Sequence, residues 1–169
     1  MKVKKIVLLL IVALGLTTLM STKCEKDDPE DPNICNGIVS AIATGNIDQT
    51  FCFDNLSTYT YEPSNYITLW ARETSTDVGF DIKISAVNNQ AVTPGTYNCG
   101  SGEPGFVEFI IEDEGSADSD FYKSQSGTIT LTQASESTFS ATFNVVAVGY
   151  YNEKSVNFSG TVDFSGIVK

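Results

Sequence analysis

The clearest pattern in the chain is an alternation of apolar and polar residues over its last third. Apolar residues occupy alternate positions in 129–131, 139–147 and 156–164, with mostly small hydroxyl and amide residues between them. Successive side chains of a strand point to opposite faces, so each run predicts a strand with one buried face. The short links 134–138 and 149–154 predict hairpins, which would make this third an antiparallel meander.

Earlier segments repeat the pattern less regularly. Apolar residues alternate in 39–43 and 51–53 and again in 67–71 and 80–86, so each pair predicts a hairpin. Residues 106–111 form a more continuous apolar strand. Pro94-Gly95-Thr96-Tyr97 predicts a turn that leads into a loop. No segment after residue 36 shows sustained helical spacing, which leaves an all-β domain.

About eight or nine strands with one apolar face each must fold over to cover that face. We expect an antiparallel β-sandwich, immunoglobulin-like or a related two-layer sandwich. An open β-barrel is the alternative, because it would bury the same face.

The N-terminal residues predict a cleaved secretory signal peptide. Lys2, Lys4 and Lys5 precede an apolar run of eleven residues, Ile6 to Leu16. This run fits the apolar region of a signal peptide and is shorter than the roughly 20 residues of a membrane-spanning helix. We therefore expect the protein to be exported.

Cys24 follows this leader and begins the sequence Cys24-Glu25-Lys26-Asp27-Asp28. The arrangement resembles a bacterial lipoprotein signal, and the acidic residues resemble the export signal of surface lipoproteins of the Bacteroidota. Ser21 and Lys23 depart from the usual residues before the lipidated cysteine, so cleavage near Ser21 or Thr22 is the alternative. The resemblance implies lipidation of Cys24 and a place at the outer membrane or cell surface; the alternative cleavage implies a soluble periplasmic or secreted protein.

The chain thus divides into a signal peptide, 1–23, an acidic tether, 24–33, and one β-sandwich domain, 34–169. The tether should stay extended, because 25–32 holds no apolar side chain. Within the domain, 94–97, 126–132 and 139–143 resemble segments of small β-rich lipoproteins of unknown function in the Bacteroidota. That resemblance implies no activity.

The charge balance excludes some partners. The chain has 10 basic and 21 acidic residues and a formal net charge of −11. Cleavage before Cys24 would remove four lysines and raise the net negative charge to about 15. Such an acidic protein is a poor match for nucleic acid or for an anionic membrane surface.

The four cysteines invite disulfides in an exported protein. If Cys24 carries lipid, Cys35, Cys52 and Cys99 can form one bridge and leave one free thiol. Cys52 lies between two phenylalanines and should face away from them. We expect Cys99, in a glycine-rich segment, to be bridged, with its partner open.

The sequence contains few of the residues and motifs that are typical of enzymes. It contains no histidine, which removes the usual general base and the commonest transition-metal ligand. Neither a Gly-x-Ser-x-Gly motif nor a phosphate-binding glycine loop is present. We therefore expect a protein that is not an enzyme, with a carboxylate-based hydrolase as the remaining catalytic alternative.

Residues 112–120 form an acidic loop that could supply oxygen ligands, from Asp113, Asp118 and Asp120, to Ca²⁺. The segment does not match the EF-hand spacing and needs no ion as a solvated loop. We therefore expect no cofactor, with calcium as the alternative.

Aromatic residues supply the binding hypothesis. If Ile67, Leu69 and Ala71 face the core, then Tyr66, Thr68 and Trp70 face outward. Flat rings beside polar groups can stack on sugars or anchor a protein partner. The candidate ring residues are Tyr59, Tyr61, Tyr66, Trp70, Tyr150 and Tyr151. We expect an envelope or cell-surface module that binds a glycan or a protein, the alternative being a purely structural component.

Overall fold

The computed structural model describes residues 35–74, 78–111 and 120–166, which belong to one compact unit, Cys35–Lys169. These residues form ten strands and no helix: β1 (Val39–Gly45), β2 (Gln49–Phe53), β3 (Asn55–Glu62), β4 (Tyr66–Arg72), β5 (Gly79–Ser85), β6 (Gly95–Asn98), β7 (Gly105–Ile111), β8 (Asp120–Ser135), β9 (Thr138–Gly149) and β10 (Ser155–Ser165). No span that could cross a bilayer as a helix is found in these three ranges.

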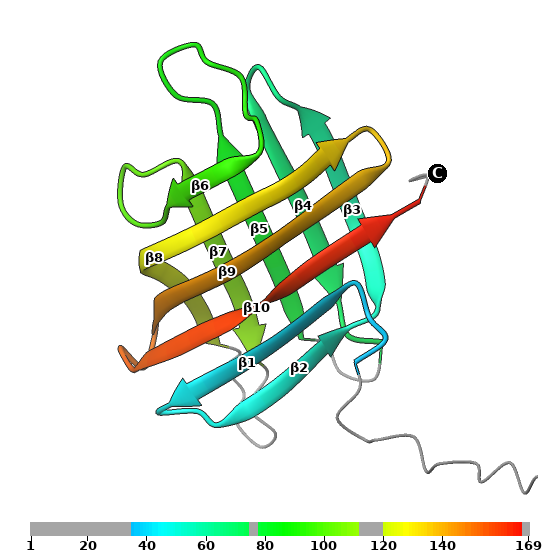
Figure 1. Ribbon diagram of the computed structural model, residues 1–169. Coiled ribbons are helices and arrows are strands. Elements are labelled where there is room, and N and C mark those ends of the chain that lie inside the picture. Colours follow the sequence, from blue (N-terminus) through cyan, green and yellow to red (C-terminus); the bar gives the residue numbers. More distant parts are fainter. Residues whose placement is uncertain (1–34, 75–77, 112–119, 167–169) are drawn as a thin grey trace, which may run out of the picture. The chain divides into compact units, whose positions relative to one another are not determined.

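All ten strands belong to one antiparallel sheet with the order β2-β1-β10-β9-β8-β7-β5-β4-β3, and β6 pairs with β8. The sheet folds over itself into two layers (Figure 1). β6, most of β8, β9, β10, β1 and β2 form the near layer, and β7, β5, β4 and β3 cross behind it. The unit is therefore a two-layer sandwich made from a single sheet.

β8 connects the two layers. Its first residues, Asp120 to Lys123, pair with β7, whereas Thr128 to Leu131 pair with β6. The pairing of β8 with β9 shifts register between Ser124 and Ser126, as in a β-bulge, which bends a strand. Gly127 follows with φ of +113°, and a Cβ there would lie 2.3 Å from the Asn144 carbonyl oxygen. The bend thus requires glycine at this position.

The two ends of the sheet are joined by one residue. Asp54 connects β2 to β3, which lie at opposite ends of the strand order. The Asp54 carboxylate accepts hydrogen bonds from the backbone N–H and the hydroxyl of Thr74, both at 2.8 Å. These bonds lower the pKa of Asp54. The sheet is thereby nearly closed, so the sandwich is barrel-like.

Phenylalanine rings from both layers fill the interior. Phe158 of β10 stacks on Phe109 of β7, with ring centroids 3.9 Å apart. It also contacts Phe80 of β5 and Phe143 of β9. All four residues are at most 4 % exposed. Because each layer supplies rings to the same cluster, the two layers share one core.

The structure confirms the all-β antiparallel fold and the predicted hairpins and meander. The loop prediction for 94–97 is wrong in part, because Gly95–Asn98 forms β6. β8 runs on past the end of β7 and offers a free edge there, and backbone pairing with Gly95–Asn98 occupies it. The hydroxyl of Tyr97 also contacts the backbone carbonyl of Thr93, which fixes the turn before the strand.

The disulfide joins Cys35 to Cys52. The expectation that Cys99 is bridged is wrong, since its thiol is free and buried. Cys52 points away from its buried neighbours, as the alternation in β2 requires, and so reaches the segment before β1. Burial raises the pKa of the Cys99 thiol to about 11. Cys24 lies outside the described residues.

Candidate binding face

The outer surface of the layer formed by β4, β5, β7 and the start of β8 carries rings and charges. On β4 the even-numbered residues Tyr66 and Trp70 face outward, because Ile67 and Leu69 between them are fully buried. The register places Trp70 opposite Asp81, Asp81 opposite Glu108, and Glu108 opposite Lys123. These four residues therefore form one row across four strands.

Cations lie against the rings of this surface. The Arg72 guanidinium lies 4.6 Å from the centre of the Trp70 ring, and the Lys83 ammonium lies 4.8 Å from that of Tyr66. Both distances fall within the reach of cation–π attraction. The Lys123 ammonium lies 3.2 Å from a Glu108 carboxylate oxygen. Each long side chain is thus held over a neighbour, which orders this surface.

Asp81 is a partly buried carboxylate at the middle of the row. Burial raises its pKa, a hydrogen bond from Thr68 opposes the shift, and the charge of Glu108 adds to it. The Thr68 hydroxyl donates at 2.9 Å to Asp81 Oδ1. Asp81 therefore holds its proton more strongly than a solvated aspartate.

The indole of Trp70 has a packing role as well. Its Nε1 lies 3.4 Å from the position that a Cβ on Gly79 would occupy, so the ring covers bare backbone of β5. A ring over a strand glycine stabilises the sheet. Stability alone could therefore explain why one aromatic residue stands at this position.

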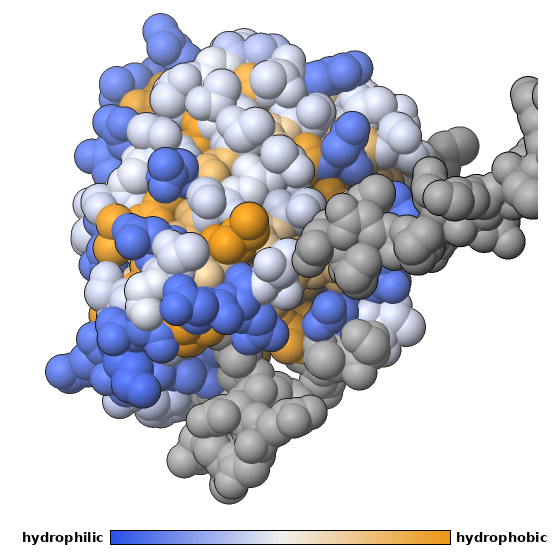
Figure 2. Space-filling view, turned by 60° about the horizontal axis from the view of Figure 1, so that its bottom comes forward, coloured by the Kyte–Doolittle hydropathy of each residue, from blue (hydrophilic) through white to orange (hydrophobic). Residues whose placement is uncertain are grey.

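The turn between β9 and β10 places two rings in solvent. Tyr150 and Tyr151 are 68 % and 64 % exposed, and their rings meet edge to face at 4.9 Å. Ile42 and Val87 are the other exposed large apolar side chains in the described ranges. Figure 2 shows one side of the unit, on which apolar residues reach the surface only in small patches between polar ones. Among the exposed large apolar side chains of the described ranges, Tyr150 and Tyr151 are the one adjacent pair.

Hydrogen bonds hold that turn. Asp120 accepts the backbone N–H groups of Tyr151 at 3.1 Å and Asn152 at 3.2 Å, one with each carboxylate oxygen. The Asn152 amide donates to the Tyr122 hydroxyl at 2.7 Å. The backbone N–H of Tyr150 donates to the carbonyl of Phe121 at 2.9 Å. The turn is therefore fastened to β8 while its two rings stay exposed.

The turn and the row across the sheet meet at β8. The Lys123 ammonium lies 6.0 Å from the centre of the Tyr150 ring, and the rings of Phe121 and Tyr151 lie 6.5 Å apart. We call the whole surface the aromatic face; it comprises Tyr66, Trp70, Arg72, Asp81, Lys83, Glu108, Lys123, Tyr150 and Tyr151. Hydroxyl hydrogen bonding and charge pairing are available on it, and ring stacking is available at the exposed Tyr150 and Tyr151. At Trp70 the Arg72 guanidinium lies over the ring, so a ligand that stacks there displaces it.

The structure divides the six ring residues named from the sequence. Tyr66, Trp70, Tyr150 and Tyr151 belong to the aromatic face. The prediction that Tyr59 lies on the surface is wrong. Its side chain is only 9 % exposed, and its hydroxyl donates a hydrogen bond to the Ser135 carbonyl at 2.6 Å. That burial raises the pKa of Tyr59 to about 12.

Tyr61 lies on the same side of β3 as Tyr59 and packs, partly buried, against the core. The two tyrosines do share a strand face, but the face points inward because it pairs with the buried residues Ile67 and Leu69 of β4. Tyr61 is therefore not part of the aromatic face.

The charged members of the face were missed by sequence reasoning. Asp81 and Lys83 alternate with buried residues of β5, and Glu108 lies between Val107 and Phe109 on β7. The alternation could have placed each of them on an outer face. It could not have placed them next to Trp70, because that depends on which strands pair.

The three candidate calcium ligands are Asp113, Asp118 and Asp120, and the structure describes the last of them alone. Asp113 and Asp118 lie outside the described residues, whereas Asp120 uses its two carboxylate oxygens on the backbone of the β9–β10 turn. Within residues 35–74, 78–111 and 120–166, no group of three or more acidic or cysteine side chains is arranged to hold a metal ion.

Comparison with known proteins finds no family model, no curated protein and no solved structure that matches this chain.

Proposed function

We propose that this protein is a binding module that recognises glycans through the aromatic face and has no catalytic role. The observation that carries the proposal is the row from Trp70 to Lys123, which ends beside Tyr150 and so joins two ring sites through charged residues. Sugar rings offer apolar C–H faces for stacking and hydroxyl groups for hydrogen bonds. The aromatic face supplies a partner for each.

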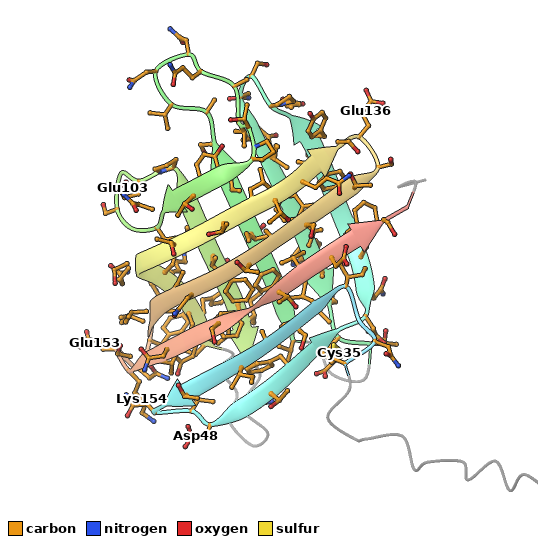
Figure 3. All side chains as sticks on the ribbon, in the orientation of Figure 1. Cys35, Asp48, Glu103, Glu136, Glu153 and Lys154 are labelled. Atoms are coloured by element: carbon orange, nitrogen blue, oxygen red, sulfur yellow. A yellow bond between two sulfur atoms is a disulfide. The ribbon has the colours of Figure 1, made fainter. Side chains whose placement is uncertain are left out.

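The distribution of charge supports a localised binding surface. Residues 35–74, 78–111 and 120–166 contain four basic residues, and three of them, Arg72, Lys83 and Lys123, belong to the aromatic face. By contrast, Figure 3 shows the labelled acidic residues Asp48, Glu103 and Glu136 on other connecting turns, whereas Glu153 and Lys154 lie on the β9–β10 turn that carries Tyr150 and Tyr151. Hydrogen-bond donors of both charged and aromatic kinds are thus concentrated on one surface.

A glycan array probed with the purified domain tests this proposal. We expect binding to one or more glycans, and Trp70→Ala should weaken it about tenfold or more, because a stacked ring contributes of the order of 1 to 3 kcal/mol. The matched control is Ile42→Ala, which truncates an exposed side chain on the other layer and should leave binding unchanged. Failure to bind any glycan, or equal losses in both variants, would contradict the proposal.

A carboxylate-based hydrolase is the second candidate, and one observation favours it. Asp81 and Glu108 are direct cross-strand neighbours, whose Cβ atoms lie about 5 Å apart in such pairs. Retaining glycosidases place two carboxyl groups at about that separation, one of them with a raised pKa, as Asp81 has. Release of reducing sugar by the wild-type domain and its loss in Glu108→Gln would establish this function instead.

We further propose that the module is exported and anchored to a membrane through a lipid on Cys24, which would display the aromatic face at the cell envelope or surface. The support is the leader and the acidic residues after Cys24. Mass spectrometry of the mature N-terminus tests this directly. An acylated Cys24 is expected, whereas a free end near Ser21 or an intact Met1 would contradict the anchor.

A further inference from the structure

The row of the aromatic face runs across the strands, perpendicular to the chain direction. Trp70, Asp81, Glu108 and Lys123 come from β4, β5, β7 and β8, which are consecutive in the sheet. Neighbouring strands lie about 4.8 Å apart, so Trp70 and Lys123 are roughly 14 Å apart along the row. One strand spacing is close to the length of one sugar unit in a linear chain.

Ring sites stand at the two ends of this row. Trp70 lies at one end with the Arg72 guanidinium over it. Tyr150 and Tyr151 lie beyond Lys123 at the other end. Between the ends lie the carboxylates of Asp81 and Glu108 and the ammonium group of Lys123, which pairs with Glu108. The arrangement is thus ring, polar row, ring.

The tyrosine end is held in place before any ligand binds. Both carboxylate oxygens of Asp120 are used by the backbone of the turn, and the Asn152 side chain is tied to Tyr122. Exposed rings on a fixed backbone lose little conformational freedom on binding, which favours affinity. The turn can therefore serve as a second contact site for a ligand that also contacts Trp70.

From these observations we propose that the ligand is a linear glycan chain that lies across the strands and contacts Trp70 and the Tyr150–Tyr151 turn at the same time. The recognised unit is then about four sugars long, since the row covers three strand spacings plus one ring contact. This inference deepens the proposed function and rests on it. A single sugar could occupy one ring site but would leave the other ring site and most of the row unused.

Titration with a size series tests the inference. We would measure binding of oligomers from disaccharide to hexasaccharide, prepared from glucan, mannan, xylan and galacturonan chains. Affinity in the series that binds should rise at least tenfold between disaccharide and tetrasaccharide and then level off, because each added unit reaches a further part of the row. Equal affinity for the disaccharide and the hexasaccharide would overturn the inference and leave the proposed glycan binding intact.

Variants at the two ends sharpen the test. Tyr150→Ala combined with Tyr151→Ala should lower hexasaccharide affinity about tenfold, so that affinity no longer rises with chain length as it does in the wild type. Ile42→Ala serves again as the control on the other layer. If the double variant binds every length as the wild type does, the tyrosine turn is not part of the site and the inference is wrong. If the wild type binds none of the four series and no arrayed glycan, the proposed function itself fails.

Asp120 acts in this scheme as a positioning residue. Asp120→Asn keeps both rings but leaves one acceptor oxygen where the turn uses two, so one of the two hydrogen bonds to the turn is lost. Hexasaccharide affinity should then fall a few-fold while disaccharide affinity holds. A merely structural role would lower the unfolding temperature and leave the dependence on chain length as in the wild type.

Discussion

The outer surfaces of the two layers differ sharply although the layers share one core. The near layer exposes small polar residues on β8, β9 and β10, which we call the hydroxyl face: Thr128, Thr130, Ser140, Thr142, Asn144, Asn157, Ser159 and Thr161. The far layer, together with the β9–β10 turn that is fastened to the start of β8, exposes the rings and charges of the aromatic face. The strands of both layers alternate buried and outward residues in the same way.

This difference separates what folding requires from what it does not. A strand with one buried face needs apolar residues on that face and tolerates many polar residues on the other. Threonine suffices on the hydroxyl face, as expected from its preference for strands. Folding accounts for Trp70, which covers Gly79, but it does not require the charged row of Asp81, Glu108 and Lys123 beside this ring. That row is the physical basis for placing the binding site there.

Phe158→Ala should have the largest effect, because this ring contacts rings of both layers. We expect a loss of about 3 to 5 kcal/mol in the free energy of unfolding, measured by urea denaturation. Trp70 fluorescence and far-ultraviolet circular dichroism should give one midpoint, as one shared core requires. Separate midpoints would mean that the two layers unfold independently. Ile42→Ala should change the free energy by less than about 0.5 kcal/mol.

Removal of the Cys35–Cys52 disulfide, which lies in the near layer, should have the next largest effect on the stability of the whole unit. The bridge closes a loop of sequence separation 17, so its loss in Cys35→Ser combined with Cys52→Ser should cost about 3 kcal/mol. A reductant should lower the unfolding temperature of the wild type and not of this variant. Cys99→Ala is the control and should remain sensitive to reductant. A wild type that is insensitive would contradict the pairing.

An exchange between the two faces gives a smaller effect on stability and a clear one on binding. Trp70→Thr places the typical residue of the hydroxyl face on the aromatic face and uncovers Gly79, so we expect a loss of about 1 kcal/mol, measured by urea denaturation. Glycan binding, measured by calorimetry, should be lost. Thr142→Trp on the hydroxyl face should create no binding. If Trp70→Thr still binds glycan, the claim that the two faces differ in function is wrong.

Asp81→Asn should change stability least and should alter its dependence on pH. The raised pKa means that the folded protein binds the Asp81 proton more strongly than the unfolded chain does. The wild type should therefore lose stability as pH rises from 3.8, the ordinary value, through the raised folded value. Asp81→Asn should lack this decline. The urea midpoints of the wild type and the variant should therefore be similar below pH 3.8, and the variant should have the higher midpoint once the pH exceeds the raised pKa of Asp81.

Glu136→Gln removes one carboxylate from an exposed turn and controls for the change in net charge. If Asp81→Asn and Glu136→Gln change the pH profile of the midpoint equally, the environment of Asp81 has no special effect. A profile altered only by Asp81→Asn would confirm that burial on the aromatic face governs this carboxylate.

The alternation of residues determined most of the strands and which side chains they bury. Ile67, Leu69 and Ala71 lie inside and Tyr66 and Trp70 outside, as period two requires. β6 could not be predicted, because its four residues become a strand only by pairing with the part of β8 that extends past β7. Cys99 was misjudged for a related reason, since a disulfide depends on which cysteines meet in space.

For Tyr59 and Tyr61 the alternation of residues could not predict which side of the strand is buried. Tyrosine suits both a core and a surface, so alternation in β3 could not tell which side faces in. The partner strand decides: β4 presents Ile67 and Leu69 opposite these tyrosines, so they turn inward.

The sequence by itself thus determined the all-β fold, the hairpins between neighbouring strands and the outward direction of Trp70, because these follow from local spacing. The tertiary structure alone decided that one sheet folds over itself and that Asp81, Glu108 and Lys123 line up between Trp70 and Tyr150. That row joins residues from distant parts of the chain. Strand order and register create it, and neither is encoded in the spacing of any one strand.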